Sequence, residues 1–243
     1  MDSPLQSILE NLAAMVRVGQ VTMELEIAAA AMLRLHGCEP AFPGQKPTGA
    51  PIPYPYVLCV SINNEVIHGM PSETRKIEDG DVVSLDLGLR KKAAELYTDG
   101  LEKLNPWEYD DGALTVIAGH GSANARKLVT ATKAALEAGC SAASPGATTH
   151  DIAAAITAVA AYFGVGIVKG YGGHGIGNAL HLPPHIPNEP LGEAVKLEAG
   201  HRYAIEPMFA TKRGDVHVAK DGWVVVLNGG GVAAHFERTV EVG

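Results

Sequence analysis

Five side chains of types that bind metals stand in strand-like or glycine-rich stretches of this 243-residue chain. Asp86 interrupts "DVVSLDLGL", Glu206 follows "YAI", and Glu237 lies within "HFERTVEV". Asp99, in "AELYTDG", can lie opposite Asp86 across a hairpin, and His174 stands in "GYGGHGIGN". A single acidic residue in a strand is usually exposed or ion-paired. The set as a whole, rather than any one member, therefore indicates chemistry.

Carboxylates that converge in one pocket repel one another strongly unless cations neutralise them. Two divalent ions carry four positive charges, which would match these four carboxylates, and a neutral imidazole would complete the ligand set. Mostly oxygen ligands with one imidazole suit Mn²⁺, Co²⁺, Fe²⁺ or Zn²⁺. The spacing alone does not bring the five residues together, so the residues permit such a site without placing it.

The glycine-rich stretch also contains the pattern G-x-G-x-x-G, from Gly170 through Gly172 to Gly175. A nucleotide-binding loop of this kind must open a helix. The prolines in the following "HLPPHIP" break a helix. The pattern therefore does not predict a phosphate site.

Helical patterns cover residues of about 4–18, 22–37, 122–139 and 149–164. Thr22 is a candidate N-cap, and Thr148 with Asp151 has capping-box spacing. Few of the short β-branched runs between them are followed by a crossover helix, which favours an α+β fold with antiparallel sheet. Segments 19–37 and 146–164 share a pattern at an offset of 127 residues, which leaves internal duplication and coincidence both open.

Composition narrows the class of protein. Apolar residues make up 47% and charged residues 19%, as in globular chains. The net charge of −8 argues against nucleic acid as a partner. The sequence shows neither an apolar run of about 20 residues nor a secretory signal, so we expect no membrane association. Three scattered cysteines indicate a reducing, cytoplasmic setting.

Five ordered motifs carry a resemblance that spans residues of about 9–242: "CVSINNEVIHGMPS", "DGDVVSLDLGL", "GYGGHGIGNALHLPP", "LEAGHRYAIEPMF" and "DGWVVVLNGGGVAAHFERTVEV". Together they resemble the bacterial type I methionine aminopeptidases, which are pita-bread metallopeptidases. The resemblance implies one catalytic domain over residues 1–243. It also implies two pseudo-symmetric halves with a curved antiparallel sheet and outer helices, enclosing two divalent metal ions (Co, Mn, Fe or Zn).

Carried over residue by residue, the resemblance implies five metal ligands: Asp86, Asp99, His174, Glu206 and Glu237. Asp99 and Glu237 would bridge the two ions, His174 would bind one ion and Asp86 the other. A metal-bridging water or hydroxide would attack the first peptide bond, and Glu206 would move the proton.

The resemblance also supplies substrate-contacting residues. His68 and His181 would be catalytic and would contact the substrate near the scissile bond. Cys59, Leu180 and Trp223 would line the methionine pocket, with Phe42 or Tyr54 as further candidates. Such an apolar, polarizable lining suits a thioether.

The implied activity is removal of the N-terminal methionine from nascent proteins and peptides with a small second residue. We expect a monomer that acts on nascent polypeptides. Two alternatives stay open: X-Pro aminopeptidase or prolidase activity in the same fold, and a pita-bread binding protein without catalysis. The chain departs from the family in the spacing of Asp86 and Asp99 and in the polar stretch after Asp99.

Overall fold

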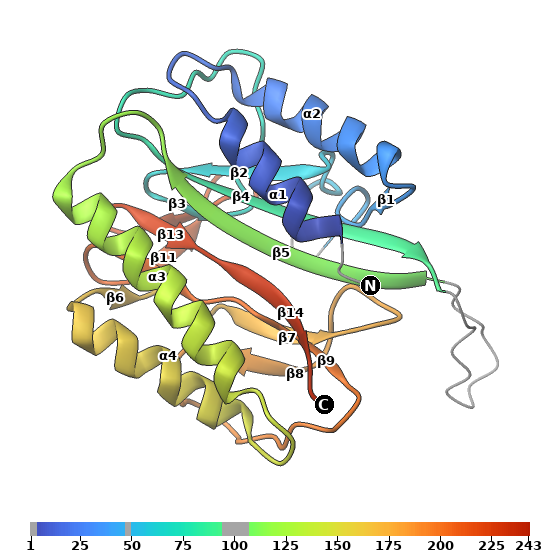
Figure 1. Ribbon diagram of the computed structural model, residues 1–243. Coiled ribbons are helices and arrows are strands. Elements are labelled where there is room, and N and C mark those ends of the chain that lie inside the picture. Colours follow the sequence, from blue (N-terminus) through green and yellow to red (C-terminus); the bar gives the residue numbers. More distant parts are fainter. Residues whose placement is uncertain (1–3, 47–49, 94–106) are drawn as a thin grey trace.

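The computed structural model describes residues 4–46, 50–93 and 107–243. Its helices form two pairs, and Figure 1 shows one pair beside the first half of the sheet and the other beside the second half. They are α1 (Pro4–Met15), α2 (Thr22–Leu35), α3 (Ala123–Ala142) and α4 (Thr149–Phe163). Among these residues, no helix is long and apolar enough to cross a membrane.

Eight strands form the main sheet: β1 (Glu39–Pro40), β2 (Leu58–Ile62), β4 (Val82–Lys92), β5 (Trp107–Ile117), β7 (Gly172–Ile176), β8 (Leu182–Pro187), β9 (Arg202–Ile205) and β14 (Glu237–Glu241). The order is β1-β4-β5-β14-β9-β7-β8, with β2 also paired to β4. Each of these pairs is antiparallel. The expected α+β fold with antiparallel sheet is therefore confirmed.

Two smaller antiparallel sheets complete the described strands. One contains β3 (Glu65–Ile67), β11 (Val216–Val218) and β12 (Val225–Leu227). The other contains β6 (Gly166–Ile167), β10 (Met208–Ala210) and β13 (Ala233–His235). Two residues of the site lie next to the first of these sheets: His68 directly follows β3, and Trp223 lies two residues before β12.

The helices begin close to the positions that their capping residues predict. Thr148 and Asp151 form the expected capping box at the start of α4, and the Ser122 hydroxyl accepts a hydrogen bond from the Ala125 amide at the start of α3. The prediction for Thr22 is wrong: Val21 is the N-cap of α2, without a side-chain cap. The Thr22 hydroxyl instead bonds the backbone of Ser72, because a tertiary partner competes for it.

The two halves repeat the same arrangement, which supports the internal duplication. On either side of the central β5·β14 pair, the sheet continues as β4 then β2 in one half and β9 then β7 in the other. The glycines at matched positions share left-handed φ values, 84° at Gly19 and 87° at Gly146, then 66° at Gly37 and 61° at Gly164. Coincidence does not explain matched backbone conformations and matched strand order together.

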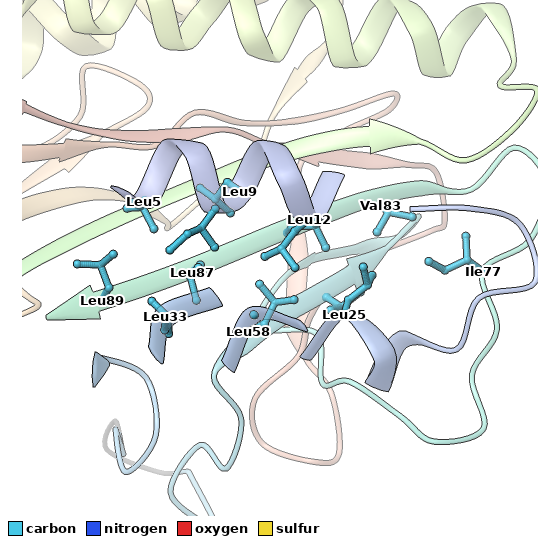
Figure 2. Packing of buried hydrophobic residues seen from close by; sticks show 14 of the residues in the cluster. Leu5, Leu9, Leu12, Leu25, Leu33, Leu58, Ile77, Val83, Leu87 and Leu89 are labelled. Atoms are coloured by element: carbon cyan, nitrogen blue, oxygen red, sulfur yellow. The ribbon is translucent and has the colours of Figure 1, made fainter. Parts of the chain in front are cut away.

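The first half is held by apolar packing of α1 and α2 on β2 and β4. Figure 2 shows Leu9 and Leu12 of α1 close to Leu87 of β4. Gly112 of β5 lets α1 approach, because a Cβ at this position would lie 3.2 Å from Leu5 Cδ2. A second cluster packs α3 and α4 on the other half of the sheet. The two cores thereby fix both sides of the central strand pair, where the acidic residues gather.

Candidate metal centre

A cavity of about 220 Å³ opens between the two halves. It is lined by nine of the residues that the sequence singles out: Cys59, His68, Asp86, His174, Leu180, His181, Glu206, Trp223 and Glu237. Phe42 and Tyr54, the further candidates from the ends of the proline-rich stretch, line it as well. The structure thus brings together residues from strands and loops that are far apart in the chain.

The second aspartate expected at the site, Asp99, lies outside the described residues. The residue paired with Asp86 across the β4·β5 hairpin is Ala113. The carboxylate that lines the cavity beside Asp86 is Asp111. It is two residues from Ala113 on β5, and a separation of two keeps it on the same face of the sheet as Asp86.

His174 presents one ring nitrogen to the acidic residues. Its Nδ1 lies 2.9 Å from the Gly175 carbonyl oxygen, and this contact favours the tautomer in which Nδ1 carries the proton. The free Nε2 lies 3.9 Å from an oxygen of Asp111, 3.8 Å from Glu206 and 3.9 Å from Glu237. A histidine held through one nitrogen with the other facing carboxylates has the orientation of a metal ligand.

Burial disfavours the charged form of the four carboxyl groups in the cavity, Asp86, Asp111, Glu206 and Glu237. Desolvation raises the pKa of Asp86 to about 7. Burial also raises the pKa of Asp111, Glu206 and Glu237 well above the usual range, and neighbouring carboxylates add to the rise at Asp111 and Glu237. These groups therefore resist ionisation together unless positive charge is nearby.

Two carboxylate oxygens in the cavity lack the partners that buried polar atoms normally have. Asp86 Oδ1 and Glu237 Oε1 are fully buried and have no hydrogen-bond donor among the described residues. Cations would satisfy both atoms. The donor set of carboxylate oxygens and one imidazole also fits divalent metal ions.

Three overlapping groups of ligand atoms each lie within 4.8 Å of one another. One joins His174, Glu206 and Glu237, and a second joins Asp86, Asp111 and Glu237. The third joins Asp111 and His174 with His181. Asp111 and Glu237 each occur beside His174 in one group and beside Asp86 in another, so the groups overlap at these two residues.

His68 approaches the cavity from the end of β3 in an unusual backbone conformation. Its φ is 61°, a left-handed value that is strained for a residue with a side chain. The ring packs edge-on against Trp223 at 5.8 Å and hydrogen-bonds the Trp223 backbone. Burial lowers the pKa of His68 to about 4, so it is neutral near pH 7. His181 lies at the exposed rim, with its ring 4.5 Å from that of His174.

An apolar wall stands next to the acidic residues. Cys59, Leu180 and Trp223 are buried there with Phe42 and Tyr54. The Trp223 Nε1 donates to the Ile52 carbonyl, which leaves the ring face to line the cavity. Burial raises the pKa of the Cys59 thiol well above its usual value, so this cysteine packs rather than reacts.

Two buried polar residues of the site escape the sequence reasoning. Asp111 lies in "WEYDDGALTVI". Several acidic residues there hide the alternation of apolar and polar residues, which in "DVVSLDLGL" marked Asp86. The stretch "GALTV" after it was the available signal. His235 is 1% exposed, and its Nε2 lies 3.5 Å from Glu206 and 4.0 Å from Glu237. Its position two residues before Glu237 in the strand pattern was the only hint.

Comparison with known proteins agrees with this geometry. The sequence model of metallopeptidase family M24 matches residues 5–99 and 108–243. A methionine aminopeptidase of Aquifex aeolicus is 40% identical over 97% of this chain and 87% of that protein. The crystal structure of methionine aminopeptidase from Thermotoga maritima has a TM-score of 0.84 at 31% identity, over 97% of this chain and 87% of that one.

The prolidase from Pyrococcus furiosus shares the fold at a TM-score of 0.68 and 19% identity, over 98% of this chain and 57% of that one. The fold is therefore the pita-bread fold that these proteins have in common. The sequence match and the shared fold both extend over nearly the whole chain, and the acidic cluster is what a metallopeptidase requires. The chain belongs to metallopeptidase family M24.

Proposed function

We propose that the chain removes the N-terminal methionine from peptides and nascent proteins as a dinuclear metal-dependent aminopeptidase. One observation carries the proposal: three buried carboxyl groups, the partly buried carboxyl group of Glu206 and one imidazole converge beside an apolar pocket with an aromatic wall. Relatives that cover most of the chain are named methionine aminopeptidase. Both halves contribute to the cluster, so residues 1–243 act as one catalytic unit.

The proposed ligands are Asp86, Asp111, His174, Glu206 and Glu237. His174 and Glu206 would hold one ion, Asp86 the other, and Asp111 with Glu237 would bridge them. When bound, the ions supply Lewis acidity, which polarises a carbonyl and lowers the pKa of a water. Asp111 takes the role that the sequence reasoning gave to Asp99.

The chain's own residues orient the substrate and move its protons. Glu206, at the cavity wall, accepts a proton from the attacking water and passes it to the departing amine. His181 at the rim donates a hydrogen bond to the developing oxyanion. His68, neutral and fixed by Trp223, faces the scissile amide nitrogen.

The apolar wall selects the first side chain. Cys59, Leu180 and Trp223 offer an unbranched thioether a polarizable surface without a polar group that needs a partner. The cavity is small against the roughly 300–1,000 Å³ of sites for drug-sized ligands. It therefore suits one linear side chain at the N-terminus.

We expect the protein loaded with Mn²⁺ or Co²⁺ to release methionine from Met-Ala-Ser and to leave Ala-Pro-Ser intact, because the apolar wall fits methionine. Liquid chromatography of the products measures both reactions. Cleavage of Ala-Pro-Ser alone would favour the X-Pro peptidase alternative. Bound metal without turnover of either peptide would favour a binding protein that lacks catalysis.

Asp111→Asn is expected to reduce metal content and to lower kcat/KM on Met-Ala-Ser by roughly a hundredfold or more, since loss of one member disables a catalytic unit. Asp99→Asn is the matched variant, and we expect it to keep both properties close to wild type. Metal analysis and steady-state kinetics measure the two effects. The opposite pattern, with Asp99→Asn inactive and Asp111→Asn active, would return the bridging role to Asp99.

The metal-free protein is expected to lose stability as the pH rises from about 4 to about 7. Burial raises the pKa of Asp86 from 3.8 to about 7, so in this window the unfolded chain releases a proton that the folded chain retains. Each proton by which the folded and unfolded chains differ changes the unfolding free energy by about 1.4 kcal/mol per pH unit. Urea unfolding in the presence of a chelator measures this slope. Asp86→Asn should reduce the slope by the share of one proton, because Asp111, Glu206 and Glu237 also keep their protons in the folded chain, and an unchanged slope would contradict the assignment.

A further inference from the structure

The two central strands of the sheet pair over a short register. β5 and β14 are paired at Ala113 with Glu237 and at Gly112 with Arg238. Continuing this antiparallel register outward places Asp111 opposite Thr239 at one end. At the other end it places Thr115 opposite His235. Both ends therefore carry a threonine facing a polar residue of the cavity region.

At each end, a threonine hydroxyl makes the hydrogen bonds that backbone groups of the partner strand would make in a continuous ladder. The Asp111 amide donates to Thr239 Oγ1 over 3.2 Å, and the same hydroxyl donates to the Asp111 carbonyl over 3.0 Å. The His235 amide likewise donates to Thr115 Oγ1 over 2.9 Å, and that hydroxyl donates to the His235 carbonyl over 2.6 Å. The two contacts are related by the internal duplication, because each strand supplies one threonine to the other.

The Thr239 contact fixes the backbone of a proposed metal ligand. Asp111 is 4% exposed, so water does not readily serve its amide and carbonyl groups. One side-chain oxygen of Asp111 accepts from the Gly112 amide at 3.1 Å. The other oxygen is directed toward His174 Nε2, at 3.9 Å. Backbone and carboxylate orientation of Asp111 are thus set together.

We propose that Thr239 is a positioning residue for the metal centre: its hydroxyl holds the Asp111 backbone so that the carboxylate faces both halves of the site. The inference rests on the proposed function. Thr115 is the internal counterpart, since it makes the same pair of bonds to His235, which is outside the proposed ligand set. Loss of the Thr239 hydroxyl leaves two buried backbone groups of Asp111 unpaired, and the strand must shift to satisfy them.

The test compares Thr239→Val, Thr239→Ser and Thr115→Val as metal-free, full-length proteins titrated with Mn²⁺ in a calorimeter. Partners of metal ligands typically change metal affinity by 10-fold or more, so we expect Thr239→Val to bind Mn²⁺ about tenfold more weakly than wild type. Thr239→Ser keeps the hydroxyl, so its Mn²⁺ affinity is expected to stay within about threefold of wild type, a smaller change than the loss of such a partner typically causes. Thr115→Val is expected to unfold at lower urea concentration and to weaken Mn²⁺ binding less than Thr239→Val does, because its partner His235 is not itself a proposed ligand.

The absorption spectrum of the Co²⁺-loaded proteins gives a second readout, because it reports ligand geometry rather than stability. We expect it to change in Thr239→Val and to be retained in Thr239→Ser. If Thr239→Val does not fold, Thr239→Ala replaces it in both measurements.

Equal Mn²⁺ affinity in Thr239→Val and wild type would overturn the inference and leave the proposed function standing. Equal weakening in Thr115→Val and Thr239→Val would also overturn it, because the threonines would then brace the sheet in general. A wild-type protein that binds no Mn²⁺ would contradict the inference and the proposed function together.

Discussion

Burying four carboxyl groups in one cavity costs free energy, because each loses hydration and each repels the others. In the metal-free chain this cost keeps Asp86, Asp111, Glu206 and Glu237 protonated to unusually high pH. Divalent cations remove the cost by replacing repulsion with coordination. The apolar cores beneath the two halves of the sheet must hold the acidic residues in place in the metal-free chain, and α1 to α4 supply those cores.

The duplicated architecture explains how distant residues reach one point. Each half delivers ligands from its own inner strand and from the central pair, so β4 and β5 carry Asp86 and Asp111 while β14 carries Glu237. The central strands pair briefly and are then bridged by threonine side chains rather than backbone.

Strand alternation marks Asp86, Glu206 and Glu237 as acids within apolar runs, and only the family resemblance assigns them together to one metal site. Capping-box spacing similarly predicts the start of α4. Local pattern cannot measure the length of a hairpin, and here the return strand begins at Trp107, beyond Asp99. Register is a long-range property set by packing against α1 and β14, so the stretch "GALTV" could mark a strand after Asp111 but could not place Asp111 beside Asp86.

The central claim is that Asp111 and Glu237 share two metal ions between the halves of the chain. The most direct measurement is anomalous diffraction at the manganese edge from crystals grown with Mn²⁺. Two peaks are predicted, each with Asp111 and Glu237 among its ligands, one beside His174 and the other beside Asp86. Peaks without Asp111, or a cavity that stays without metal at saturating Mn²⁺, would contradict the claim.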